Sequence, residues 1–183
     1  MKTNNTYIAI LRGINVSGQK MIKMEVLRKM MESLGFQEVS TYIQSGNVVF
    51  RAENTSTTEV TEEIAEKIQE EFGFHVPVIV LEAETLGLII AGNPIATDPA
   101  LDTGKIHVTF LASSPPSCDL EAIGAKKMDG ERIAFSDHAV YLYCPNGYGN
   151  TKLSNDFLER KLKVTATTRN WNTVLELMRI AGE

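Results

Sequence analysis

Residues 7–11 (YIAIL) decide the fold class, because every side chain in this short run is apolar. A run of this kind is typical of a strand that is buried on both faces of a sheet. Apolar residues then recur at helix spacing between residues 27 and 34, and Gly35 is placed to end that helix. The chain therefore begins with a strand, a loop and a helix.

A hairpin and a second helix follow. Residues 38–43 and 47–51 are rich in β-formers and flank a turn in which Gly46 supplies a left-handed or bulged conformation. The next helix opens at Ser56 and Glu59, which have capping-box spacing, and it closes at Gly73.

The next strand, residues 75–81, contains Pro77. Proline cannot donate to a ladder, so we expect an edge strand. In a split βαββαβ sheet the last strand is an edge and the first is central, which fits both Pro77 and the apolar run at 7–11. We therefore predict a ferredoxin-like α+β subdomain with an antiparallel sheet. We expect its 38–51 hairpin at the opposite end of the sheet from the loop after residue 11.

The second half partly repeats this plan. A short helix over 84–91 and a connection rich in Gly, Pro and Asp lead to a predicted strand at 105–112, a helix at 117–123 and a hairpin at 131–144. Helices are predicted near 154–162 and 170–181. We therefore expect a related βαββα subdomain plus a terminal helix, with boundaries 1–82, 83–104 and 105–183.

The composition is that of a soluble globular protein: 183 residues, 43% hydrophobic and 22% charged. The net charge of −5 argues against a generic nucleic-acid binder, but the charge is uneven. Residues 1–51 carry seven Lys/Arg against three Asp/Glu, residues 145–183 carry six against four, and the middle carries five against sixteen. The basic ends allow a local positive patch.

The expected location is the cytoplasm. The first residues lack the long apolar region and cleavage site of a signal peptide, and no apolar stretch is long enough to span a bilayer. Cys118 and Cys144 show no CxxC spacing and have no histidine companions, which favours a reducing compartment. No membrane association is predicted.

The loop in residues 10–21 (ILRGINVSGQKM) comes close to a Walker A motif, but Lys20 stands one place too far along and Met21 replaces the magnesium-binding hydroxyl. Two interpretations stay open. The amides of its two glycines could form an anion-binding nest beside Arg12 and Lys20. Alternatively, the loop is a connection that needs glycine for positive φ.

The C-terminal segments 145–155 (PNGYGNTKLSN) and 166–172 (ATTRNWN) are the more unusual ones. Ser154 and Asn170 are suited to cap two helices. A functional interpretation has two helix N-termini converge on an anion together with Lys152, Asn155 and Arg169. Trp171 is expected to anchor the last helix in the core, with a stacking platform for a base as the minority interpretation.

Residues with catalytic chemistry are few. His75, His107 and His138 are isolated in the sequence and are predicted to be structural. The carboxylates of the second helix resemble a solvated face rather than an acid/base pair. No nucleophile elbow, metal site or cofactor is predicted, and whether the protein is an enzyme stays open.

Four segments, LRGINVSG (11–18), TYIQSGNVVF (41–50), TKLSN (151–155) and ATTRNW (166–171), together resemble the bacterial domain of unknown function 1697 family. The resemblance extends over essentially the whole chain. It implies an α+β fold with a ferredoxin-like N-terminal part, no established activity and no assigned catalytic residues. Ser17 is a local departure, since many relatives have a Gly-Gly pair at Ser17-Gly18.

Two hypotheses of function follow. In the leading one, the protein binds a phosphate-bearing ligand, either a nucleotide or a nucleic acid, through Arg12, Asn15, Lys20, Lys152, Asn155, Arg169 and Asn170. In the alternative, it is a non-catalytic protein-interaction module in which the signature residues are structural.

Overall fold

The computed structural model describes residues 4–116 and 118–182. The contacts between residues divide the chain into two units. Unit 1 comprises Met1–Gly87 and Leu177–Glu183, and unit 2 comprises Leu88–Glu176. The divisions fall inside helices α3 (Ala83–Ala91) and α6 (Trp171–Ala181).

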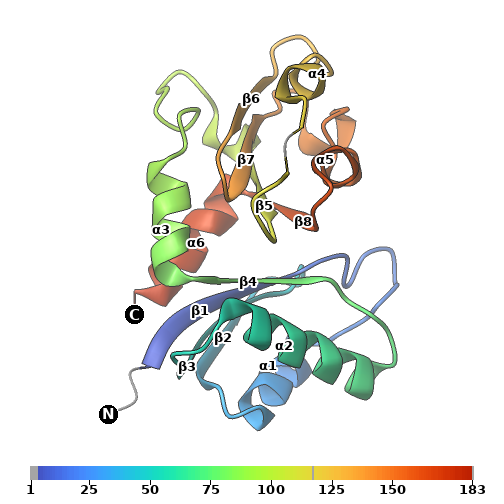
Figure 1. Ribbon diagram of the computed structural model, residues 1–183, viewed down its shortest axis with the longest axis vertical. Coiled ribbons are helices and arrows are strands. Elements are labelled where there is room, and N and C mark those ends of the chain that lie inside the picture. Colours follow the sequence, from blue (N-terminus) through green and yellow to red (C-terminus); the bar gives the residue numbers. More distant parts are fainter. Residues whose placement is uncertain (1–3, 117, 183) are drawn as a thin grey trace. The chain divides into compact units, whose positions relative to one another are not determined.

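Unit 1 contains a four-stranded antiparallel sheet in the order β2-β3-β1-β4, which is the ferredoxin-like arrangement that the sequence predicts. Its elements run in the order β1 (Asn4–Leu11), α1 (Met24–Ser33), β2 (Gln37–Tyr42), β3 (Asn47–Glu53), α2 (Thr57–Phe72) and β4 (Val78–Glu82). Helices α1 and α2 cover one face of this sheet (Figure 1).

Strand β1 is central, as the apolar run predicts, and its last five residues are fully buried. It pairs with β3 on one side and with β4 on the other, so that Ile10 lies opposite both Asn47 and Ile79. The side chains that alternate toward α1 and α2 form the core of unit 1, which includes Tyr7, Leu11 and Phe50.

The predicted helix ends of unit 1 are confirmed. Ser56 accepts a hydrogen bond from the Glu59 amide and the Glu59 carboxylate accepts one from the Ser56 amide, which completes the capping box of α2. Gly73 and Gly35 end α2 and α1 with φ of +75° and +87°, in the left-handed region that glycine favours.

The position of the β2-β3 hairpin differs from the prediction. The hairpin lies at the same end of the sheet as the loop after β1, because β1 and β3 are antiparallel and the end of β1 therefore meets the start of β3. The Leu11 amide donates to the Gly46 carbonyl at 2.8 Å. The expectation of opposite ends was wrong, and both loops form one end of unit 1.

Strand β4 is an edge strand, as predicted, although Pro77 lies just before it rather than inside it. The strand begins at Val78, and the Pro77 carbonyl accepts a hydrogen bond from the Arg12 amide at 2.9 Å. Pro77 therefore marks the entry to the strand.

Unit 2 is a second α+β unit with its own antiparallel sheet, in the order β6-β7-β5-β8. Its elements are β5 (Ile106–Leu111), α4 (Leu120–Gly124), β6 (Arg132–Phe135), β7 (Ala139–Tyr143), α5 (Asn155–Leu162) and β8 (Ala166–Asn170), with short 3-10 turns at Thr103–Lys105 and Tyr148–Asn150. The strand β8 completes a second βαββαβ unit, where the sequence had predicted βαββα followed directly by a helix.

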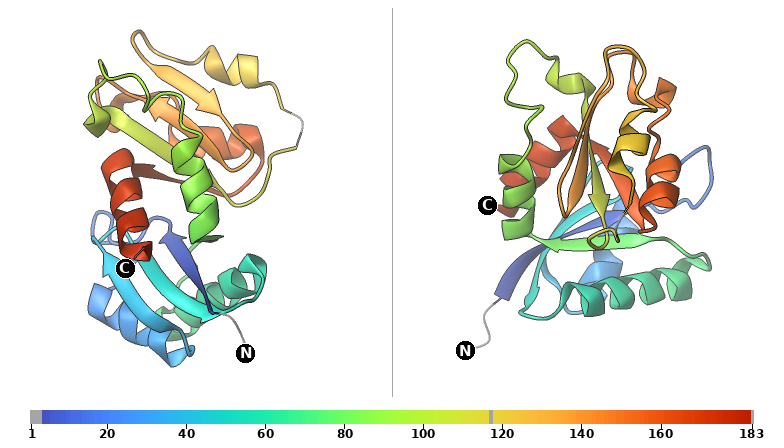
Figure 2. Two further views of the ribbon diagram at one scale, coloured as in Figure 1. Left: turned by 90° about the vertical axis from the view of Figure 1, so that its left-hand side faces the viewer. Right: turned by 45° about the horizontal axis from the view of Figure 1, so that its top comes forward.

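Helices α4 and α5 lie on one face of the unit 2 sheet (Figure 2), over a core that includes Leu111, Val140 and Leu158. The helix predicted over 117–123 begins at Leu120, and Ser117 lies outside the described residues. Among the described residues, no helix is long and apolar enough to cross a membrane.

Candidate functional site

The loop between β1 and α1 forms a small hairpin. The Asn15 amide donates to the Lys20 carbonyl at 3.2 Å, and the Gln19 amide donates to the Val16 carbonyl at 2.9 Å. Ser17 and Gly18 occupy the two central positions with φ of +50° and +73°, as a type I′ turn requires. Gly18 therefore has the positive φ that glycine adopts readily, which both interpretations of the loop require.

Asn15 joins this loop to the β2-β3 hairpin. Its side-chain Nδ2 donates to the carbonyls of Ile22 at 2.9 Å and Gln44 at 2.8 Å. Its Oδ1 accepts a hydrogen bond from the Ile22 amide at 2.8 Å. Since its own φ is +56°, Asn15 occupies the left-handed conformation that asparagine tolerates better than most residues. One side chain thus fixes the geometry of two loops.

The two predicted cations of this loop have different environments. The Lys20 ammonium donates to the His75 carbonyl at 2.7 Å, which ties the loop to the segment before β4. Arg12 is half-buried at the start of the loop. Both residues belong to the loop at this end of unit 1.

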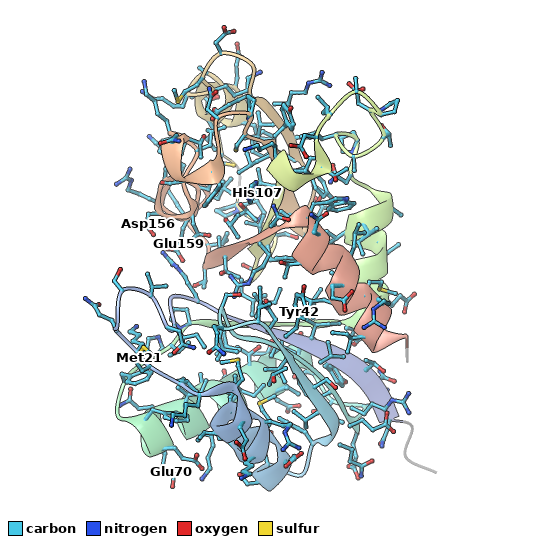
Figure 3. The ribbon with its side chains drawn as sticks, turned by 180° about the vertical axis from the view of Figure 1, so that it is seen from behind. Met21, Tyr42, Glu70, His107, Asp156 and Glu159 are labelled. Carbon is cyan, nitrogen blue, oxygen red and sulfur yellow. The ribbon has the colours of Figure 1, made fainter. Side chains whose placement is uncertain are left out.

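Three large apolar side chains stand exposed at the same end. Val16 is 58% exposed, Met21 62% and Ile43 47%. The Asn15 amide contacts the carbonyls of the residues that directly follow Met21 and Ile43, so these side chains belong to adjacent segments. Met21 lies at the outer edge of unit 1 (Figure 3). We call Val16, Met21 and Ile43, with the cations Arg12, Lys20 and Lys23, the tip surface.

Ile43 is also strained. Its φ of +50° is a left-handed conformation that a β-branched residue rarely adopts, at a cost of about 1–3 kcal/mol. Its side chain stays half in solvent, so burial offsets little of that cost. Strain held at an exposed apolar residue favours a role in recognition.

In unit 2, the second pair of signature segments is joined by a hydroxyl network around Thr168. Thr168 Oγ1 donates to Asn155 Oδ1 at 3.1 Å, accepts from the Tyr148 hydroxyl at 3.0 Å and lies 2.8 Å from Thr109 Oγ1. Asn155 Nδ2 donates to the Ala166 carbonyl at 3.1 Å. These bonds hold the start of α5 against β8 and β5.

His107, which is labelled in Figure 3, adjoins this network through its contact with Tyr148. Its ring stacks on that of Tyr148 with centroids 4.9 Å apart, and its Nδ1 lies 3.2 Å from the Lys105 carbonyl oxygen. Burial lowers the pKa of His107 below its ordinary value and raises the pKa of the Tyr148 hydroxyl. The sequence offered no signal for this pair, because only the strand register and the Tyr148 turn bring the two rings together.

The other predicted residues of unit 2 lie around β8. Asn170 Nδ2 donates to the Gly104 carbonyl at 2.8 Å, while its Oδ1 accepts the Asn172 amide at 2.9 Å. Asn170 therefore caps α6, and Ser154, which accepts the Phe157 amide at 3.3 Å, caps α5 as predicted. Lys152 is exposed.

Arg169 lies on the other side of the strand. Side chains alternate along β8, so Arg169 points to the face opposite Thr168 and Asn155. Its Nη1 donates to Thr167 Oγ1 at 3.2 Å and to the Thr168 carbonyl at 2.9 Å. Burial lowers the pKa of the guanidinium to about 10, so that it stays charged at neutral pH.

The seven predicted site residues thus come from two units. Unit 1 contributes Arg12, Asn15 and Lys20 from one loop, and unit 2 contributes Lys152, Asn155, Arg169 and Asn170. Within unit 2, Asn155 and Arg169 are placed on opposite faces of the sheet. Trp171 is 5% exposed, which confirms the prediction of a core anchor.

A pocket of about 340 Å³ in unit 2 lies apart from the seven predicted site residues. Its lining is mostly apolar and includes Leu111, Phe135 and Val140, with Cys118, Ser136 and Asp137 at its polar positions. Its lining residues include no cation. In the part of the chain that the structure describes, no three His, Cys, Asp or Glu side chains gather as a metal site would require.

The fold and the signature segments together define a class: an α+β protein built from two βαββαβ units, each with a four-stranded antiparallel sheet. The model of the family described as protein of unknown function (DUF1697) matches residues 4–141, and the chain belongs to this family. The match includes the two N-terminal signature segments and ends before the two C-terminal ones.

A solved structure supports the same fold. The conserved bacterial protein SP0830 from Streptococcus pneumoniae is 22% identical in sequence, and the match covers 98% of this chain and 99% of that one with a TM-score of 0.70. At this identity the likeness shows the fold alone. No curated protein is similar enough in sequence to be matched as a relative.

Proposed function

We propose that this chain is a protein-interaction module whose signature residues are structural and whose contact region is the tip surface. One observation carries the proposal: the side-chain amides of Asn15, Asn155 and Asn170 all bond to groups of the chain itself. Both N–H groups of the Asn15 amide are used within the chain, and the amides of Asn155 and Asn170 likewise hold loops and helix ends in place. Exposed apolar groups on a rigid end of a unit favour protein contact.

The experiment compares the melting temperatures of three variants with that of the wild type. Asn15→Gly keeps the left-handed backbone conformation but removes three hydrogen bonds, so we expect a clear fall in melting temperature. Arg169→Ala is expected to lower it as well, because two hydrogen bonds of Arg169 are lost. Met21→Gln is expected to leave it unchanged. Equal melting temperatures for the wild type and both destabilising variants would contradict the structural role of these residues.

A phosphate-bearing ligand is the second candidate function. The observation in its favour is electrostatic: Lys152 is exposed, and residues 10–24 carry three cations and no carboxylate. A nucleotide or nucleic acid bound by the cations of either unit would raise the melting temperature, with an effect that falls steeply as salt increases. A thermal-shift screen with nucleotides, sugar phosphates and oligonucleotides at low and high salt tests this candidate. If no compound changes the melting temperature at low salt, the phosphate-bearing ligand is ruled out as a candidate.

We place the protein in the cytoplasm as part of this proposal. Cys118 and Cys144 are both free thiols, which supports a reducing compartment. Fractionation of cells that produce the protein would test the location.

A further inference from the structure

The tip surface combines exposed apolar side chains with positive charge. Val16, Met21 and Ile43 are each about half exposed or more. The two segments that carry them, residues 10–24 and 41–50, contain Arg12, Lys20 and Lys23 but no Asp or Glu, and the carboxylate of the next residue, Glu25, pairs with Lys29 at 2.9 Å. A partner that fits this surface therefore needs apolar side chains together with negative charge.

The surface is also held rigid before any partner arrives. Two backbone hydrogen bonds close the turn at Ser17 and Gly18, one from Gln19 to Val16 and one from Asn15 to Lys20. The side chain of Asn15 then joins the loop to the β2-β3 hairpin. Lys20 ties the same loop to the His75 carbonyl. Because little conformational entropy is left to lose, a short segment of a partner can bind here without reordering the loops.

Aliphatic side chains on this surface argue against a nucleic-acid partner. Proteins that hold single-stranded nucleic acids do so largely by stacking bases on exposed aromatic rings. The apolar groups exposed on the tip surface are two aliphatic side chains and a thioether. Of the two aromatic residues of the hairpin, Phe50 is buried and Tyr42, labelled in Figure 3, is half-buried. Methionine and aliphatic groups are instead suited to the apolar side chains of a peptide.

We propose that the tip surface binds an acidic segment of another protein, in which at least one large apolar side chain contacts Met21 and Val16 while carboxylates face Lys20 and Lys23. This inference rests on the proposed interaction function and names the chemistry of its partner. Opposite charge accelerates the encounter and sets the register, and the apolar contact supplies most of the affinity.

The experiment is a selection of random peptides displayed on phage against the immobilised full-length protein. Phage that bind the double variant Val16→Ser/Met21→Gln are removed in a counter-selection, so that the remaining peptides depend on the tip surface. We expect these peptides to be enriched in Asp and Glu and to share a Leu, Phe or Met position. Fluorescence anisotropy with synthetic copies of the peptides then measures their affinities.

We expect Met21→Gln to weaken these peptides about tenfold and Lys23→Glu to weaken them by a similar factor. The matched control is Leu88→Gln, which removes a side chain that is 63% exposed on α3 rather than on the tip surface, and it should leave the affinity unchanged. Each variant is first checked for a wild-type melting temperature. A loss of affinity at high salt is also expected.

The experiment distinguishes failure of the acidic partner from failure of the protein-interaction function. Peptides that depend on the tip surface but are neutral or basic would overturn the acidic partner while leaving the interaction function standing. If no peptide discriminates the wild type from the double variant, the interaction function fails too. If oligonucleotides bind the wild type and the Met21→Gln variant binds them more weakly, the partner is a nucleic acid, and the proposal of an acidic protein segment is wrong.

Discussion

Gly46 lies so close to Ile14 that a Cβ atom added to Gly46 would come within 2.6 Å of Ile14 Cδ1 and within 2.9 Å of Leu11 Cβ. Its φ is +82°, in the left-handed region. The hairpin turn and the loop after β1 therefore depend on glycine here both for its backbone conformation and for its lack of a side chain. Through this contact, two signature segments that are far apart in the sequence pack directly against each other.

Gly46→Ala should consequently be severe. The left-handed conformation and the steric overlap together are expected to lower the free energy of unfolding by about 2–4 kcal/mol. Gly18→Ala is the matched control, because Gly18 has a φ of +73° but no atom within 4 Å of an added Cβ, and its cost should be about 1 kcal/mol. Urea denaturation measures both variants. Equal losses would mean that the Gly46 contact is not tight in solution.

Thr168→Val tests the hydroxyl network of unit 2. The substitution keeps the shape of the side chain but removes the oxygen that serves Thr109, Tyr148 and Asn155. We expect a loss of about 1–3 kcal/mol, since polar groups are left without a partner away from water. Thr165→Val, at an exposed position in the preceding loop, should change stability by less than about 0.5 kcal/mol. A Thr168→Val protein as stable as the control would show that solvent replaces the network.

His107 is expected to make stability depend on pH. Its pKa in the folded protein lies below the ordinary value of 6.5 because burial disfavours the charged ring. The unfolded chain therefore binds the proton more readily, and stability is lost as the pH falls below about 6.5 until the folded pKa is reached. Melting temperatures at about pH 7.5 and about pH 5.5 measure the effect. The melting temperature of His107→Gln should decrease less between these two pH values than that of the wild type. Identical decreases in the two proteins would mean that groups other than His107 cause the pH dependence.

The two thiols should differ in reactivity. Cys144 is buried, and burial together with the nearby charge of Glu131 raises its pKa to about 11, so little thiolate forms at neutral pH. Cys118 is partly exposed. Mass spectrometry after alkylation of the folded protein should therefore find the label on Cys118, with Cys144 modified only after denaturation. Rapid labelling of Cys144 in the folded state would indicate that this part of unit 2 opens.

Much of the fold could be predicted because the pattern of apolar residues repeats at the right period. The buried run of β1, the capping box at Ser56 and the glycine at position 73 are local signals, and local interactions decide those features. Strand β8 was missed for the opposite reason. Its sequence, ATTRN, is mostly polar and continues without a break into α6, so that its strand character depends on pairing with β5.

The candidate site was harder to predict, because the same residue types serve structure and ligands. The spacing of Gly13, Gly18 and Lys20 resembles a phosphate loop, whereas the sequence gives no sign of the hydrogen bonds from Asn15 to Ile22 and Gln44. The error about the hairpin end was one of topology: the antiparallel pairing of β1 with β3 already implies that Leu11 and Gly46 meet. The exposure of Met21 and Val16 depends on how the folded chain packs around them, so it could not be predicted from the amino-acid composition.

The junction between β8 and α6 has no linker, because Asn170 is the last residue of the strand and Trp171 the first of the helix. The end of β8 therefore fixes the direction in which each side chain of α6 points. One inserted residue would rotate the rest of α6 by about 100° about its axis, given its 3.6 residues per turn. The buried stripe formed by Trp171, Val174 and Leu177 would then turn away from the core. A change in length at this point would therefore displace every buried side chain of α6 at once, whereas a substitution affects one side chain.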